Sequence, residues 1–321
     1  MNRYRLVHVT EFIYDGLVSE SYNEVRMRPM QDEAQSCLSF RLTTEPAATT
    51  SFYLDYFGNW VHQFNILPDH RRLRVEAECV VLVTDPKPPD SRSLTMSELP
   101  SLREQTTDDY YDLLAPSIYI PHTRELNGLA ELAERECDGT VPGFVTSAVN
   151  MIKSRFTYEK GATRVNSSIQ DSLRSGAGVC QDFAHILIGI ARVRGLPARY
   201  VSGYLVPTRT AEPDANVEEV VGGQASHAWT EIYIPGSGWV GQDPTLGRPA
   251  GLRHIRVAYG RDYGDVPPVR GVYKGHAGQR LSVDVRVRPA LDHEGHECLQ
   301  ETAAGPVTPP VEEPPQQQQQ Q

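Results

Sequence analysis

Long apolar segments and an excess of basic residues are both missing from this 321-residue chain. None of its apolar runs approaches the ~18 residues that a membrane helix needs. The first residues, MNRYRLVHVTEFIYDG, contain no apolar core of the kind found in secretory signals. The 31 Lys and Arg residues are outnumbered by 41 Asp and Glu, and the net charge is −10. We therefore expect neither a membrane nor a nucleic acid as the partner of this protein.

Cysteine is scarce and scattered. The cysteines are Cys37, Cys79, Cys137, Cys180 and Cys298. They are odd in number and never occur in C-x-x-C spacing, which argues against a disulfide framework and against a structural zinc site. The sequence also has no calcium loop of the type D-x-[DN]-x-[DN]-G. We therefore expect reduced thiols, a cytoplasmic location, and no metal or cofactor.

The first quarter of the chain has the pattern of antiparallel β-strands. Residues 3–14 alternate roughly between apolar and polar. Further runs rich in Tyr, Val, Phe and Thr follow at short spacing, over residues 38–44, 52–57, 60–66 and 71–85. We predict an N-terminal antiparallel β-sandwich-like domain over residues 1–84. A Pro-rich stretch follows it, and we place a linker at residues 85–110.

Beyond the linker the pattern changes to helices followed by strands. Residues 125–137 and 141–156 carry apolar residues at three- and four-residue spacing. The strongest helical stretch is 181–194, which a Gly-Leu-Pro sequence ends. Strands are predicted over residues 198–206, 227–234, 239–243 and 280–288. We therefore predict an α+β catalytic domain over residues 111–290, followed by a disordered tail over residues 291–321 that is acidic and rich in Pro and Gln.

One cysteine stands where a glycine-rich turn leads into the strongest predicted helix. The sequence Gly176-Ala177-Gly178-Val179-Cys180 places its thiol at the helix N-terminus. Unpaired N–H groups and the positive end of the helix dipole favour a thiolate there, and low-pKa thiols of this kind are reactive. The glycines would let a substrate carbonyl approach the sulfur. A buried, inert helix cysteine is the alternative interpretation.

A histidine and an aspartate lie on two predicted strands that a tight turn connects. His227 begins the first strand and Asp243 ends the second. Symmetrical pairing places Asp243 opposite Thr230, and a small shift near the turn brings it diagonal to His227. A carboxylate that orients an imidazole is half of a catalytic triad, and Cys180 would supply the nucleophile.

These three residues occur in extended stretches that resemble the transglutaminase-like superfamily. The stretches are GVCQDFAHILIGIARVRGLPARYVSGYL, SHAWTEIYIPGSGW and DPT. More narrowly, the chain resembles the bacterial branch described as cysteine proteases, and the resemblance continues through residues 254–275. The N-terminal region resembles the β domain that precedes the core in that branch, at Tyr4, His8, Thr10, Tyr14, Asn23, Arg26, Pro29, Asp55, Phe57, Gly58 and Asn59.

The resemblance implies a papain-like, transglutaminase-like α+β core with Cys180, His227 and Asp243 as its catalytic residues. Cys180 would attack an amide carbonyl, His227 would transfer the proton, and Asp243 would orient the imidazole. The oxyanion would need preorganised donors. The Cys180 backbone N–H is one candidate, and Tyr158 and Gln181 are candidates for a second.

This resemblance predicts a cysteine-dependent amide hydrolase that forms a thioester with a peptide, a protein or an amide polymer. Two alternatives stay open, namely transfer of a glutamine acyl group to an amine, and a non-catalytic peptide-binding module. For two other polar residues we expect structural roles. Arg199 is expected to pair with a buried acid rather than bind a substrate carboxylate, and His185 to pack within its helix. The histidines of residues 293–297 lack the spacing of H-E-x-x-H, so no metal site is predicted there.

Overall fold

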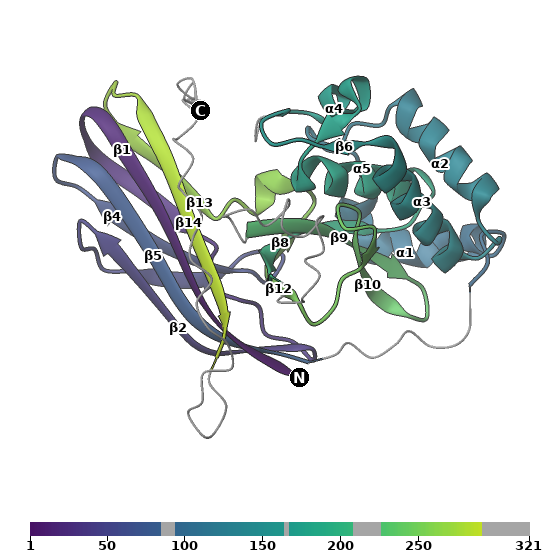
Figure 1. Ribbon diagram of the computed structural model, residues 1–321, viewed down its shortest axis with the longest axis horizontal. Coiled ribbons are helices and arrows are strands. Elements are labelled where there is room, and N and C mark those ends of the chain that lie inside the picture. The colour runs from purple at the N-terminus through teal and green to yellow at the C-terminus, as the bar shows by residue number, and fades with distance from the viewer. Residues whose placement is uncertain (85–93, 164–166, 208–225, 291–321) are drawn as a thin grey trace.

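The computed structural model describes residues 1–84, 94–163, 167–207 and 226–290 (Figure 1). They form a large antiparallel β-sheet and, beside it, a second unit in which helices pack on a smaller sheet. The predicted class, a β domain with an α+β core, is thereby confirmed. Every helix within these ranges is too short or too polar to span a bilayer. The predicted tail lies outside the described residues.

The large sheet has the strand order β2-β5-β1-β4-β3, and two strands from the end of the chain also pair with β1. Its strands are β1 (Asn2–Val25), β2 (Gln35–Glu45), β3 (Ser51–Leu54), β4 (Trp60–Ile66), β5 (His70–Val83), β13 (Val269–Lys274) and β14 (Gln279–Pro289). The first half of β1 pairs with β5 and β14, and its second half pairs with β4 and β13. The domain is therefore one curled sheet, whereas a sandwich has two separate sheets.

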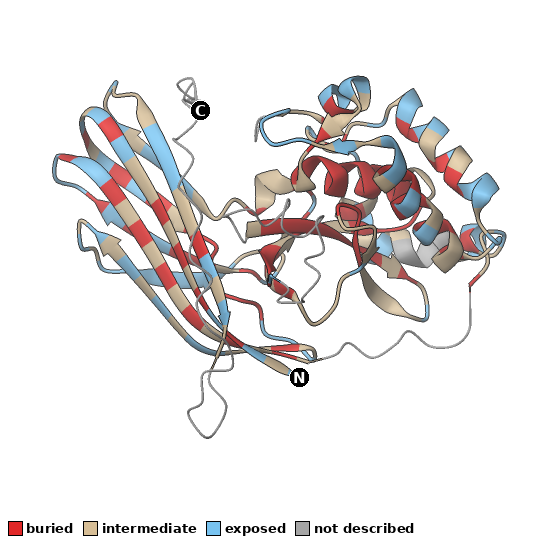
Figure 2. Cartoon of the chain, viewed as in Figure 1, coloured by how far each residue is buried: buried red, intermediate tan, exposed pale blue. Residues whose placement is uncertain are grey.

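Alternation along the strands directs one face of this sheet to the interior. The buried residues of β5 include Leu73, Val75, Ala77, Cys79, Val81 and Val83, and the residues between them are more accessible. This alternation appears as bands along the strands in Figure 2. Because successive side chains of a strand point to opposite faces, the buried set lies on one face of β5. Its first three members belong to one apolar cluster and its last three to another.

The second unit is built on a five-stranded sheet of order β11-β10-β9-β8-β12. Its strands are β8 (Ala198–Leu205), β9 (Ser226–Ile234), β10 (Gly238–Asp243), β11 (Arg248–Pro249) and β12 (His254–Gly260). The helices are α1 (Leu99–Leu114), α2 (Arg124–Glu136), α3 (Val141–Arg155), α4 (Ile169–Ser175), α5 (Cys180–Val193) and the short 3₁₀ helix η1 (Tyr263–Asp265). A small parallel pair joins β6 (Thr157–Tyr158) to β7 (Ala177–Gly178).

Helix α5 is the centre of this unit. Every residue from 181 to 192 is buried, as the red helix in Figure 2 shows. A helix that is apolar on nearly all sides is stable only when neighbours surround it. On one side, the Thr230 hydroxyl of β9 donates to the Ala184 carbonyl at 3.0 Å. The helix ends as predicted, because Gly195 adopts a φ of 77° just beyond it.

The two units share one core and are joined by specific hydrogen bonds. Buried side chains of β1 and β5 belong to the same apolar cluster as those of α5 and β12. The His8 Nδ1 atom lies 2.7 Å from the Tyr204 hydroxyl. The Asn59 amide donates to the Tyr259 carbonyl and accepts the Tyr259 N–H, both at 2.9 Å. His8 and Asn59 thus connect the units, and both have a structural role.

Two segments lie elsewhere than the sequence pattern indicated. The strand predicted over residues 280–288 exists as β14, but it pairs along β1 from Tyr4 opposite Pro289 to Tyr14 opposite Gln279. Figure 1 shows the yellow-green β14 beside the purple β1, so the first and the last described strands lie side by side in the large sheet. Alternation indicates a strand but not its partner. Helix α1 begins at Leu99, inside the segment predicted as a linker, with a proline in its first turn.

Candidate active site

Cys180 is the first residue of α5, and its neighbours fix the turn that precedes it. The Asp182 carboxylate accepts the Val179 N–H at 2.8 Å and the Thr163 hydroxyl at 2.5 Å. A Cβ on Gly178 would lie 2.9 Å from the Asp182 Cβ, so glycine is required there. Cys180 itself is partly exposed. The residue is therefore not fully buried, unlike the cysteine of the alternative interpretation, and it lies at a helix N-terminus. Its reactivity stays a prediction.

His227 and Asp243 lie on neighbouring strands of one hairpin. Gln242 pairs with Thr230, which puts Asp243 diagonal to His227. The shift of one residue comes from the turn, since three residues, 235–237, connect the strands and the central glycine has a φ of 83°. Three-residue hairpin turns commonly place a residue in the left-handed region. The small shift predicted near the turn is thereby confirmed.

The Asp243 carboxylate holds His227 by a short hydrogen bond. The His227 Nε2 atom lies 2.7 Å from Asp243 Oδ2, and both side chains are buried. Burial alone would lower the pKa of His227, but the charge and hydrogen bond of Asp243, together with the Cys180 thiol, raise it to about 10. Burial alone would raise the pKa of Asp243, but His227 and a second histidine hold it well below its usual range. The carboxylate is therefore ionised, and the proton lies on Nε2.

The other nitrogen of the same ring is the one available to Cys180. His227 Nδ1 is buried and has no regular hydrogen-bond partner in the described part of the chain. The Cys180 thiol is nevertheless one of the groups that act on this ring, since it raises the pKa of His227. With the proton of the neutral ring on Nε2, the lone pair of Nδ1 is the acceptor for the thiol proton. The structure thus brings the three predicted residues together.

The structure also adds a residue to which sequence reasoning assigned no role. His254, at the start of β12, places its Nε2 atom 3.0 Å from Asp243 Oδ2. Its Nδ1 atom accepts the Gly251 N–H at 3.1 Å. The Trp229 ring packs edge-on against His254 at 5.0 Å between ring centres. The stretch that begins at His254 contributed to the family resemblance, but no spacing in the sequence links it to Asp243.

Four hydrogen bonds surround the Asp243 carboxylate. Oδ2 receives the two imidazoles, and Oδ1 accepts the backbone N–H groups of Thr245 at 3.0 Å and Leu246 at 3.1 Å. A buried carboxylate is costly unless such partners satisfy it. The turn after β10 and the start of β12 therefore supply what keeps Asp243 ionised beside His227.

The residues His227, Asp243 and His254 offer three ligand atoms within 4.8 Å of one another. Their hydrogen bonds do not fit a metal site, however. A metal-bound imidazole normally donates its other N–H to an acceptor, whereas Nδ1 of His254 accepts the Gly251 N–H. The ring proton of His254 is therefore on Nε2, directed at Asp243. The group fits a hydrogen-bonded carboxylate, not a set of metal ligands.

Two other polar residues considered for the site have structural partners. Arg199 donates to the Glu231 carboxylate at 2.8 Å, and its guanidinium lies 3.6 Å from the centre of the Tyr259 ring. The predicted pairing of Arg199 with a buried acid is confirmed. His185 is fully buried, and its Nε2 atom accepts the Tyr263 N–H at 3.1 Å. His185 therefore packs in the core, as expected, and has no access to a substrate.

The two candidates for a second oxyanion donor lie near Cys180, Gln181 as the next residue of the chain and Tyr158 on the neighbouring strand β6. Tyr158 is partly exposed on β6 and pairs with Gly178 of β7, two residues before the cysteine. Gln181 is buried in the first turn of α5. Residues 293–297 and the Gln-rich end lie outside the described part of the chain.

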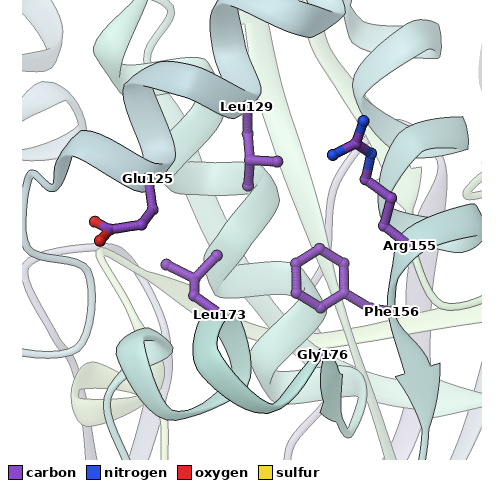
Figure 3. Close-up of a pocket in the computed structure, with 6 residues that line it drawn as sticks. All are labelled: Glu125, Leu129, Arg155, Phe156, Leu173 and Gly176. Carbon is purple, nitrogen blue, oxygen red and sulfur yellow. The ribbon is translucent and has the colours of Figure 1, made fainter.

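A separate pocket lies between α2, α4 and the end of α3 (Figure 3). Its volume is about 370 Å³, and it is lined by Glu125, Leu129, Arg155, Phe156, Leu173 and Gly176. None of the predicted site residues lines it. The pocket is therefore distinct from the Cys180 site.

Two family models match this chain, one over the large sheet and one over the second unit. Residues 4–82 match the family described as the bacterial transglutaminase-like N-terminal region. Residues 132–244 match the family described as the transglutaminase-like superfamily. The second match contains Cys180, His227 and Asp243, and it ends before His254.

Similar proteins extend over nearly the whole chain. An uncharacterized protein of Mycobacterium leprae is 36% identical over 289 residues, which is 89% of this chain and 99% of that protein. An uncharacterized protein of Mycobacterium tuberculosis is 32% identical over 314 residues, covering 90% of this chain and 93% of that protein. The crystal structure of a "putative cysteine protease" from Cytophaga hutchinsonii has a TM-score of 0.68 at 21% identity and covers 94% of each chain. This last similarity shows the fold.

Proposed function

The chain belongs to the transglutaminase-like superfamily, and from this premise we propose that it is a cysteine-dependent amide hydrolase, a peptidase or an amidase. One observation carries the proposal. His227 engages the ionised Asp243 through Nε2 at 2.7 Å, its buried Nδ1 atom has no hydrogen-bond partner in the described part of the chain, and the Cys180 thiol is among the groups that raise the pKa of the ring. In this arrangement Cys180 is the nucleophile, His227 the acid and base, and Asp243 the group that orients the imidazole.

The first half of the reaction forms an acyl-enzyme. The Cys180 thiol gives its proton to His227 Nδ1, and the resulting thiolate attacks the carbonyl carbon of the amide. A C–S bond forms, the C–N bond breaks, and the proton on His227 Nδ1 leaves with the amine or ammonia. Asp243 stabilises the imidazolium during this step because its negative charge lies beside Nε2.

The negative oxygen of the tetrahedral intermediate requires hydrogen-bond donors. The first N–H groups of a helix have no partner within the helix, so the Cys180 N–H is one donor in this proposal. Tyr158 is the second, because the pairing of β6 with β7 sets it beside Gly178. Two donors of this kind supply a large part of the rate enhancement in acyl transfer.

The second half of the reaction resolves the thioester. Water gives its proton to His227, its oxygen bonds to the acyl carbon, and the C–S bond breaks to release a carboxylic acid and restore the thiol. The substrate class is a peptide, a protein or another amide polymer. If an amine takes the place of water, the same intermediate gives transglutamination, and the accepting nucleophile decides between the two outcomes.

The test compares amide turnover in the wild type with the Cys180→Ala variant. Fluorogenic peptide amides are offered with and without a labelled primary amine, and the acyl-enzyme is trapped by acid quenching for intact-mass spectrometry. We expect turnover and an acyl adduct on Cys180 in the wild type, and neither in the folded variant. Undiminished turnover by Cys180→Ala would reject the proposal.

Two other results distinguish the alternatives. Incorporation of the labelled amine faster than hydrolysis would favour acyl transfer. A folded wild-type protein whose Cys180 reacts no faster than a free thiol, and which binds peptides without cleaving them, would favour the binding module.

The variant Cys37→Ala is the matched control for Cys180→Ala, because Cys37 lies on β2 of the large sheet, away from α5.

A further inference from the structure

Asp243 stands between two imidazoles, and only one of them is required by the chemistry proposed above. His227 Nε2 lies 2.7 Å from Oδ2, and His254 Nε2 lies 3.0 Å from the same oxygen. We propose that His254 is a positioning residue of this site, which fixes the Asp243 carboxylate on His227 and thereby sustains the reactivity of Cys180. This inference rests on the proposed function of the three residues and extends it to a fourth.

A backbone N–H group decides the direction of both hydrogen bonds of the His254 ring. The Gly251 N–H must donate, and its acceptor is His254 Nδ1 at 3.1 Å. A neutral imidazole has one N–H, so the proton of His254 is on Nε2 and points at Asp243. His254 is thus a fixed donor to the same oxygen that receives His227. A rotation of the carboxylate that broke one bond would break the other.

His254 reaches this oxygen from a distant part of the sheet. It begins β12, whereas Asp243 ends β10, and the strands β9 and β8 lie between them in the sheet order. Room for the approach exists because Gly203 on β8 has no side chain. A Cβ there would lie 2.6 Å from the Trp229 ring and 2.1 Å from the Ile255 carbonyl oxygen. The contact therefore depends on the close packing of β12 and the Trp229 ring against Gly203, and it does not follow from strand pairing.

The surroundings of His254 keep it a neutral donor. The ionisable groups that act on it are Asp243 from β10, His227 from β9 and Arg248 at the start of β11. Burial lowers the pKa of His254, and the positive charges of His227 and Arg248 lower it further. The hydrogen bond and charge of Asp243 raise this pKa, but the net change is a decrease. His254 is therefore uncharged near pH 7, and it does not compete with the imidazolium of His227 for the negative charge of Asp243.

The experiment measures how fast iodoacetamide alkylates Cys180 between pH 5 and 10, read at that residue by mass spectrometry. The proteins are the wild type, His254→Phe, His254→Gln and His227→Ala. Phenylalanine fills the ring volume without a donor, whereas the terminal amide of glutamine can donate from nearly the position of Nε2. His8→Phe is the matched control, since it removes a buried imidazole that bonds Tyr204 and not Asp243.

We expect His254→Phe to move the midpoint of the profile to higher pH. Alkylation at pH 6 should become about tenfold slower, because the carboxylate no longer holds His227 in the orientation that activates the thiol. His254→Gln should recover most of the rate. His8→Phe should lower the melting temperature and leave the profile unchanged. A folded His254→Phe protein with the wild-type profile would overturn the proposal.

Three results separate this proposal from its premise or from a metal-binding role. An ordinary thiol profile in the wild type, unaffected by His227→Ala, would reject the Cys180–His227 pair and the role of His254 together. A wild-type profile that collapses upon addition of EDTA and returns with Zn²⁺ would show His254 to be a metal ligand and would also overturn the proposal. A wild-type profile that depends on His227 but not on His254 would reject the positioning role alone.

Discussion

The Nε2 atom of His227 lies 2.7 Å from Oδ2 of Asp243, and the carboxylate is completely excluded from solvent. A buried ion of this kind persists only where donors surround it. Asp243 has such donors in two imidazoles and two backbone N–H groups. The consequence for His227 is a raised pKa of about 10, which favours the imidazolium that a neighbouring thiolate requires.

Removing the negative charge of Asp243 while keeping the shape of its side chain tests whether this charge raises the pKa of His227. We expect Asp243→Asn to slow the alkylation of Cys180 at pH 6 by at least about tenfold, since the imidazolium loses its stabilising charge. The rates at pH 10, where free thiols are ionised, should differ little from those of the wild type. The measurement is the rate of iodoacetamide modification at Cys180. Equal rates at pH 6 would show that the carboxylate does not act on the pair.

The same pair makes the stability of the protein depend on pH in a defined window. The pKa of His227 rises from its ordinary value of 6.5 to about 10 in the folded protein. Its contribution to stability is therefore fully present below pH 6.5 and is lost as the pH rises through about 10. The pKa of Asp243 is lowered, so its contribution is present above the ordinary carboxyl range and is lost only in strong acid.

We expect the melting temperature of the wild type to fall more between pH 7 and pH 10 than that of His227→Gln. Thermal unfolding followed by circular dichroism at both pH values provides the comparison. Other groups titrate in this range in both proteins, so the difference between the two curves isolates His227. Parallel curves would contradict the raised pKa.

The sequence predicts the site largely because its parts are local. A glycine-rich turn before an apolar helix places Cys180 at the N-terminus of α5, where the structure has it. The hairpin connects His227 and Asp243 through a turn of three residues, 235–237. The diagonal position of Asp243 therefore follows from turn chemistry within a stretch of neighbouring residues.

Contacts between distant segments were not predictable in the same way. His254 meets Asp243 only because the chain passes from β10 to the far edge of the sheet, past two other strands. Likewise, the alternation of β14 indicates a strand, but the same pattern suits either sheet, and its pairing with β1 depends on the tertiary fold. Periodicity records which face of an element is buried, not which neighbour covers it.

The buried ion pair of Arg199 and Glu231 should contribute to stability and not to substrate binding. The Glu231 side chain is only 5% exposed, so Arg199→Met leaves its charge with the more distant Arg256 at 3.6 Å. Removal of one partner of a buried pair costs about 3 kcal/mol. We expect urea unfolding to show this loss of unfolding free energy in Arg199→Met. The double variant with Glu231→Met should recover part of it. The alkylation profile of Cys180 should be unchanged in both. Lost amide turnover at unchanged stability would instead assign Arg199 to the substrate.

Gly203 provides a test of the packing that brings His254 to Asp243. A Cβ at this position would lie 2.1 Å from the Ile255 carbonyl oxygen and 2.6 Å from the Trp229 ring, so the alanine variant forces β8 and β12 apart or displaces the indole. Overpacking of this kind costs about 1–3 kcal/mol. Because His254 precedes Ile255 and contacts Trp229, Gly203→Ala should also slow the alkylation of Cys180 at pH 6.

Gly128 is the matched control for this prediction. It lies within α2, and a Cβ there would meet no atom within 4 Å. Gly128→Ala should raise the unfolding free energy by about 0.5–1 kcal/mol, since alanine is the better helix former, and should leave Cys180 unchanged. Urea unfolding and the alkylation rate are measured on both variants. If Gly203→Ala destabilised the protein but left the rate at the wild-type value, the sheet packing would tolerate the change without moving His254, and the route from Gly203 to the carboxylate would be refuted.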